Sequence, residues 1–179
     1  MSGSVGDNTA RASGVIASAG GGGKILQVVE YITPTHISRN GTSWGDFGSV
    51  SQAITPTAAS SKILVSFATG GCGNQNSGCF KFLFDIDGGG YNNMPGMGTA
   101  AGSRTDCHFA AIAFGNGTAL TWSYLHTPSY TLTDVLTYKL QSTTENSGYP
   151  VVCGSSHNDS NVRNTPRTST SVKLTEIGA

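Results

Sequence analysis

The chain has 179 residues and a formal net charge of zero, and charged residues occupy only 11% of positions. This share is well below the roughly one quarter that is typical of soluble domains. The length fits one domain with an extension, and the neutral balance without a Lys/Arg cluster argues against a nucleic-acid partner. The polar surface must therefore be mainly Ser, Thr, Asn and Gly, which suits a protein that sits among copies of itself.

The N-terminal region reads as an arm. Its first ten residues lack the basic and apolar regions of a secretory signal peptide, and no apolar run in the chain is long enough to cross a bilayer. We therefore expect synthesis in the cytoplasm of the cell that makes the protein, and no membrane partner. Four glycines (Gly20, Gly21, Gly22 and Gly23) then form a hinge. The sequence predicts an extended arm over residues 1–23 and a body over residues 24–179.

Three side chains of the arm are candidate contacts with a partner. Arg11 supplies a bidentate hydrogen-bond donor, and Val15 and Ile16 supply two apolar plugs. The glycines followed by Lys24 resemble a phosphate-binding loop only superficially. Ile25 stands where that loop needs a hydroxyl side chain, and a strand is predicted where it needs a helix.

The body is predicted to consist of β-strands, because apolar and polar residues alternate along it. In one segment Phe80, Phe82, Phe84 and Ile86 share a face. The first strand is apolar on both faces, which predicts cover on both sides. We expect strands at about residues 24–32, 47–54, 61–69, 79–87, 107–115, 119–126, 134–143, 149–154 and 170–177.

Many short strands with polar turns are typical of a sandwich or a barrel. Asn116-Gly117, between two alternating runs, predicts a hairpin. The sequence therefore predicts an all-β fold, an antiparallel jelly-roll-like β-sandwich. Three long loops are expected to be functional or to contact partners, at residues 70–78, 88–106 and 155–169. In the second of them Tyr91, Met94 and Met97 predict an interface tip or a glycan contact.

No pattern of catalytic residues is visible. The four histidines and ten acidic residues are dispersed, and no nucleophile motif is present, so we expect no enzymatic activity. Asp85-Ile86-Asp87-Gly88 lacks the further ligands of a calcium loop and is better explained as a turn. We expect no metal and no other cofactor. Trp44, Tyr91, Tyr130 and Tyr149 lie in or near loops. They either stack on sugars or have a structural role, in which they pin the loops to the body or fill a subunit interface.

The four cysteines leave two interpretations open. A protein that is not secreted keeps its thiols reduced. The spacing makes Cys72 with Cys79 the best candidate for a disulfide, because the two flank a short Gly/Asn/Ser loop. Cys107-His108 and Cys153 with His157 lack the tight pairs of a structural zinc site.

Three stretches resemble one family. They are GKILQVV at residues 23–29, ITPTAASSKILV at residues 54–65 and KLTEIGA at residues 173–179. Together they resemble small β-sandwich virion proteins of tailed phages of aquatic bacteria, including cyanophages. This resemblance implies a part of a tail fibre or of the capsid surface, commonly a homotrimer, and implies no catalytic residue.

The short arm favours one role within that family. Only about 23 residues precede the body, which is too short for a fibre shaft and suits a tether. The sequence therefore predicts a capsid decoration (cement) protein on the virion surface, whose partners are copies of itself and the major capsid protein. The alternative is a tail-fibre or receptor-binding module that recognises host surface glycans.

Overall fold

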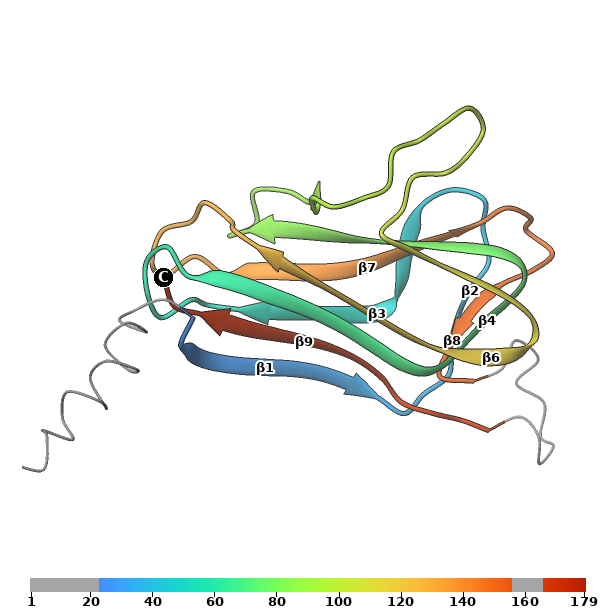
Figure 1. Ribbon diagram of the computed structural model, residues 1–179, viewed down its shortest axis with the longest axis horizontal. Helices are drawn as coiled ribbons and strands as arrows, with labels where there is room; N and C mark the ends of the chain where they lie inside the picture. The colour runs from blue at the N-terminus through green and yellow to red at the C-terminus, as the bar shows by residue number, and fades with distance from the viewer. Residues whose placement is uncertain (1–22, 156–165) are drawn as a thin grey trace, which may run out of the picture.

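The computed structural model describes residues 23–155 and 166–179. Arg11, Val15, Ile16 and the first three hinge glycines lie outside these residues. Every regular element in the described ranges is a strand (Figure 1), so they contain no helix that could cross a membrane. The strands are β1 (Ile25–Thr33), β2 (Ile37–Arg39), β3 (Gly45–Ile54), β4 (Lys62–Ile86), β5 (Asn92–Asn93), β6 (Phe109–His126), β7 (Leu136–Thr144), β8 (Val151–Cys153) and β9 (Thr170–Ile177).

Two long strands, β4 and β6, each contribute to both layers of a sandwich. The first half of β4 lies between β9 and the second half of β6, and the second half of β4 lies between β7 and the first half of β6. The first sheet is thus ordered β1-β9-β4-β6 and the second β3-β7-β4-β6, with every pairing antiparallel. Figure 1 shows β4 running the length of the sandwich, turning at its far end and returning.

This strand order is that of a jelly roll. If each half of β4 and β6 is counted as a strand, eight principal strands follow along the chain. The first, eighth, third and sixth form one sheet, and the second, seventh, fourth and fifth form the other. This is the order produced by two interlocking Greek keys. The predicted all-β, jelly-roll-like sandwich is confirmed.

The predicted hairpin at Asn116-Gly117 is wrong. The residues before and after it belong to one strand, and both halves of that strand pair with β4 rather than with each other. Residues 70–78, expected to form a loop, likewise continue β4 through register shifts. Bulges of this kind let a strand bend from one layer to the next. A Cβ atom on Gly117 would lie 3.0 Å from the Ser155 carbonyl oxygen, so the bend needs glycine at this close approach.

Two short strands were not expected. Strand β2 pairs with β8, which joins β4 at Cys72 and Gly73, and together they close the end of the sandwich where β4 turns. Strand β5 pairs with Leu83 and Phe84 of β4. Segments of two or three residues are too short to show an alternating pattern, which is why the sequence did not reveal them.

The space between the sheets is filled largely by aromatic rings. Phe80 and Phe109 stack with their centroids 5.0 Å apart, and Phe82 stacks on Trp122 at 5.1 Å. Phe47 meets the edge of Phe80 from the second sheet at 5.2 Å. Of these contacts, the one between Phe82 and Trp122 joins the two layers, whereas the other two lie within the second sheet. Full burial of a ring of this size contributes about 1.5–3 kcal/mol by removing it from water.

Candidate functional site

The three segments that carry the family resemblance meet at one end of the sandwich. The first and last are joined by backbone hydrogen bonds, from Gly23 N to Gly178 O (2.9 Å) and from Gly178 N to Lys24 O (2.8 Å). The middle segment is the loop between β3 and β4, which reaches β9 through the Glu176 side chain. Residues 1–22 therefore join the body beside its C-terminus, at the end marked C in Figure 1.

Glu176 holds this end together. Its side chain is fully buried and accepts hydrogen bonds from Thr57 N (2.9 Å), Thr57 Oγ1 (3.0 Å), Ala58 N (3.1 Å) and Gln27 Nε2 (2.8 Å). Burial by itself raises the pKa of Glu176, but these donors and Ser61 outweigh it and lower the pKa below its ordinary value. Glu176 is thus an ionised acceptor that fixes one loop and one strand to β9.

Tyr130 closes the same end from the loop between β6 and β7. Its hydroxyl donates to Ala58 O at 2.7 Å and approaches Ser61 O at 3.3 Å. Of the two interpretations open for the loop aromatics, Tyr130 therefore fits the one in which the ring pins a loop. Gly23, the last hinge glycine, has a φ of +88°, a conformation that favours glycine.

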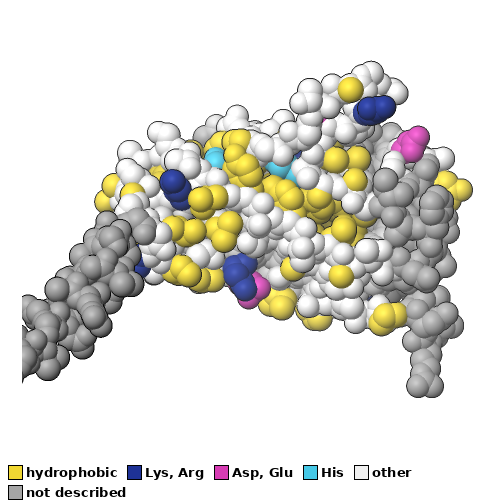
Figure 2. All heavy atoms as spheres, viewed as in Figure 1, with side chains coloured by type: hydrophobic (Ala, Val, Ile, Leu, Met, Phe, Trp, Pro, Cys, Tyr) yellow, Lys and Arg dark blue, Asp and Glu magenta, His cyan; other side chains and the backbone are white. Residues whose placement is uncertain are grey.

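The outer face of the first sheet carries few charges and mixes apolar side chains with Ser and Thr. The register aligns its outward side chains in three rows across β1, β9, β4 and β6. The middle row holds one ion pair, Lys173 with Glu30 at 3.8 Å. In the view of Figure 2 apolar side chains are spread over the surface and charged ones are few. The rows are Val28, Thr175, Leu64 and Leu125; Glu30, Lys173, Ser66 and Ser123; Ile32, Ser171, Ala68 and Thr121.

Strand β1 forms the open edge of this sheet and carries its most exposed apolar side chains. Ile25, Val28 and Ile32 are 61%, 50% and 60% exposed. Within the single chain only the side of Val29 and Tyr31 packs on the core, so the expectation of cover on the other side stays a prediction about a partner. A long apolar edge strand is a site at which another chain readily docks.

The outer face of the second sheet has the opposite character. Lys139 Nζ donates to Asp46 at 2.9 Å, and Gln141 Nε2 donates to the same carboxylate at 2.8 Å. The Gln141 hydrogen bond is the main reason why the pKa of Asp46 is lowered. Two rings flank this polar network, with Lys81 lying 4.7 Å from the centre of the Trp44 ring and Lys139 lying 3.8 Å from that of Tyr91.

The three residues of the expected interface tip, in the loop after β4, do not all lie at the surface. Tyr91 is 44% exposed, and Met97 is half-buried. Met94 is 1% exposed and belongs to the core, where its backbone N–H donates to Phe82 O at 3.0 Å. Met94 therefore anchors the loop and does not present itself to a partner.

The cysteines pair differently from the expected Cys72 with Cys79. Cys72 lies opposite Cys153 of β8, with the two sulfur atoms 3.0 Å apart and both side chains buried. Cys79 instead shares a side-chain hydrogen bond with Cys107, and both of these thiols are half-buried. That hydrogen bond lowers the pKa of Cys107 to about 7 and raises the pKa of Cys79. All four cysteines are free thiols.

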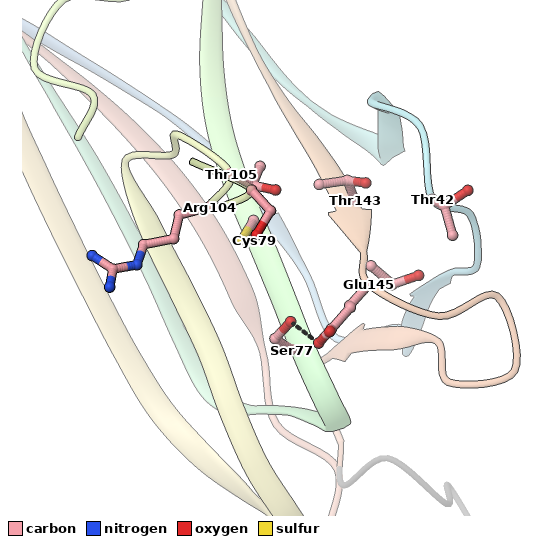
Figure 3. A pocket seen from close by; sticks show the side chains of 9 residues that line it. Thr42, Ser77, Cys79, Arg104, Thr105, Thr143 and Glu145 are labelled. Carbon is pink, nitrogen blue, oxygen red and sulfur yellow. Dashed lines mark hydrogen bonds between the residues drawn. The ribbon is translucent and has the colours of Figure 1, made fainter. Parts of the chain in front are cut away.

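A polar cavity of about 540 Å³ lies beside Cys79 (Figure 3). Ser77 Oγ donates to Glu145 Oε2 at 3.1 Å, and the Arg104 side chain points away from this pair. Hydroxyl groups supply most of the remaining lining. The cavity thus offers polar contacts from several loops, while the raised pKa of Cys79 makes its thiol a poor nucleophile. The lining residues are Thr42, Ser77, Cys79, Ser103, Arg104, Thr105, Thr143, Thr144 and Glu145.

In the turn after β4, the Asp85 side chain accepts hydrogen bonds from the backbone of the turn itself. Both Asp85 carboxylate oxygens accept backbone hydrogen bonds, from Gly88 N (2.9 Å) and Gly90 N (2.6 Å). Asp87 and Gly88 adopt positive φ values of 51° and 77°, as in a tight turn. Among the residues that the structure describes, no group of three or more His, Cys, Asp or Glu side chains is placed to hold a metal ion.

Comparisons with known proteins give the chain no family name. No protein-family model matches it, and no curated protein matches its sequence.

One residue and several pairings at these surfaces were not predicted from the sequence. Glu176 gives one local signal, an acidic side chain in a strand of alternating small and apolar residues. Cys107 and Cys153 are separated from their partners by 28 and 81 positions, and only the register of β4 brings each pair together. The outward rows of the first sheet depend equally on strand order, which no local pattern encodes.

Proposed function

We propose that this protein is a capsid decoration (cement) protein, which binds the outer surface of a phage head and stabilises it. The observation that carries the proposal is the outer face of the first sheet, which holds few charges and exposes Ile25, Val28 and Ile32 along its edge. The jelly-roll strand order, which recurs among viral capsid and lectin domains, supports it.

The proposed mechanism is thermodynamic. A ligand that binds the assembled shell and not its dissociated subunits stabilises the shell by mass action. Several weak contacts made by one oligomer add up through effective concentration. A surface that is dominated by small and apolar groups supplies many such contacts without strong repulsion between neighbouring copies.

We assign the edge of the first sheet to contacts between copies of the chain, as a homotrimer. Replacing both Val28 and Ile32 by Lys places two like charges on this edge and should convert the oligomer to monomers in light scattering. Leu132→Lys is the matched control, because Leu132 is 49% exposed in the loop between β6 and β7 and does not belong to the first sheet. A wild-type protein that is monomeric at all concentrations would contradict this assignment.

We assign residues 1–22 to contacts with the major capsid protein, through Arg11, Val15 and Ile16. The truncation should begin at Gly23, because the Gly23 amide donates to Gly178 and belongs to the body. The truncated protein should keep the unfolding midpoint of the full chain and lose co-sedimentation with phage heads that lack the protein. Undiminished co-sedimentation would overturn the role of the arm.

Glycan recognition is the second candidate, and the outer face of the second sheet favours it. Trp44 and Tyr91 flank the network of Asp46, Lys139 and Gln141, and sugar sites often combine aromatic rings with such polar groups. If this candidate holds, isolated protein should adsorb to host cells, and Trp44→Ala with Tyr91→Ala should abolish adsorption. Undiminished adsorption by the double variant would exclude this face.

A further inference from the structure

The buried thiols of Cys72 and Cys153 are arranged for a covalent bond. They are register partners on adjacent antiparallel strands, β4 and β8, and their sulfur atoms lie 3.0 Å apart. Directly opposed residues of antiparallel strands have Cα atoms about 4.5–5.5 Å apart, which lies within the range that disulfides span. A small rotation of the two side chains therefore suffices to join the sulfur atoms.

We propose that Cys72 and Cys153 are a disulfide-forming pair, which a small-molecule disulfide such as oxidised glutathione converts to a cross-strand bond while the chain folds. One cysteine thiolate attacks a sulfur of the oxidant and releases one molecule of reduced thiol. The second cysteine then loses its proton, attacks the mixed disulfide and releases the other thiol. Two protein thiols are oxidised, and one small disulfide is reduced to two thiols.

Burial explains why the bond must form during folding. Both side chains have no exposed surface, so a reagent of glutathione size cannot reach them in the folded protein. Burial also raises the pKa of Cys153 well above its ordinary value, which keeps this side chain in the unreactive thiol form in the folded protein. Once formed, the bond is protected from reductants by the same burial.

The bond would fasten the end of the sandwich where β4 turns. Cys72 lies within the bend of β4, and Cys153 belongs to the ribbon of β2 and β8. In Figure 1 this end of the sandwich lies opposite the end marked C, where Glu176 makes its hydrogen bonds. The disulfide would thus stabilise one end, and the Glu176 hydrogen bonds stabilise the other. The closed ring contains β5, β6 and β7. The inference does not depend on the proposed function.

The test isolates this pair. Cys79→Ser with Cys107→Ser leaves Cys72 and Cys153 as the two remaining cysteines. This variant is unfolded under reducing conditions and refolded in a glutathione redox buffer, and its thiols are titrated after denaturation. We expect the refolded variant to contain no free thiol and to have the mass of a monomer. Its midpoint of guanidinium unfolding should fall when a reductant is added. The control carries Cys153→Ser in addition to these two substitutions. Its midpoint of guanidinium unfolding should not change when a reductant is added.

Wild-type protein refolded in the same way provides a second measurement, which does not depend on the variants folding. Peptide mapping without reduction should recover Cys72 linked to Cys153. A link between Cys72 and Cys79, or a Cys72 that stays free in refolded protein, would overturn the proposal. Exclusively intermolecular links would also overturn it.

Discussion

Glu176→Gln is the perturbation that most directly probes how the arm end of the sandwich is built. The buried carboxylate accepts hydrogen bonds from two backbone amides, one hydroxyl and Gln27. An amide at this position loses the charge and turns one acceptor into a donor that faces other donors. Leaving a buried donor without its acceptor costs about 1–3 kcal/mol, and Thr57 is open enough to water to recover part of the loss.

We therefore expect Glu176→Gln to lower the free energy of unfolding at pH 7 by about 3 kcal/mol. In a chain of this size that corresponds to a fall of about 6–12 °C in Tm. Because the folded pKa of Glu176 is lowered, its stabilisation is complete above the ordinary value of 4.5 and disappears as the pH falls through the folded pKa. The difference between variant and wild type should thus shrink at pH 3.

Guanidinium unfolding at pH 7 and pH 3 measures both effects. Glu30→Gln is the control, since Glu30 is an exposed carboxylate on the neighbouring strand whose ion pair with Lys173 is long, at 3.8 Å. Its effect should stay within about 0.5 kcal/mol. Equal stability of Glu176→Gln and wild type at pH 7, or an unchanged difference at pH 3, would refute the reasoning.

Two further predictions follow from buried or paired side chains. His126 is 4% exposed, lies 2.9 Å from the Tyr138 hydroxyl and has a pKa lowered to about 4 by burial. Wild type should therefore lose about 3 kcal/mol of stability as the pH falls from 6.5 to 4, and His126→Gln should lose much less in the same unfolding titration. Alkylation of Cys107 by iodoacetamide should rise with pH around a midpoint near 7, because Cys79 stabilises its thiolate. Cys79→Ala should move that midpoint towards 9, and an unmoved midpoint would count against the thiol pair.

The sequence predicted the fold class because alternation is local and strong. Phe80 and Phe82 stand on one face in the sequence and are fully buried in the structure. The same pattern predicted the ends of most long strands to within a few residues. It failed at the bends of β4 and β6, because Gly70 and Gly117 look like turn residues whether the strand reverses or only bends.

The surfaces were less predictable, since they depend on which strands become neighbours. The exposed positions of β1 look like core positions in the sequence, and only the place of β1 at the sheet edge leaves them open. Conversely, Met94 looks like an exposed loop residue and fills the core. The pairing of Cys72 with Cys153 rather than Cys79 likewise needs the register between β4 and β8.

Imaging a phage particle that carries this protein, with its copies counted on the same preparation, tests the central claim most directly. The decoration account predicts density for the jelly-roll body on the outside of the head, repeated over the shell in many copies, with residues 1–22 in contact with coat subunits. Density confined to the tail tip in a few copies would contradict it.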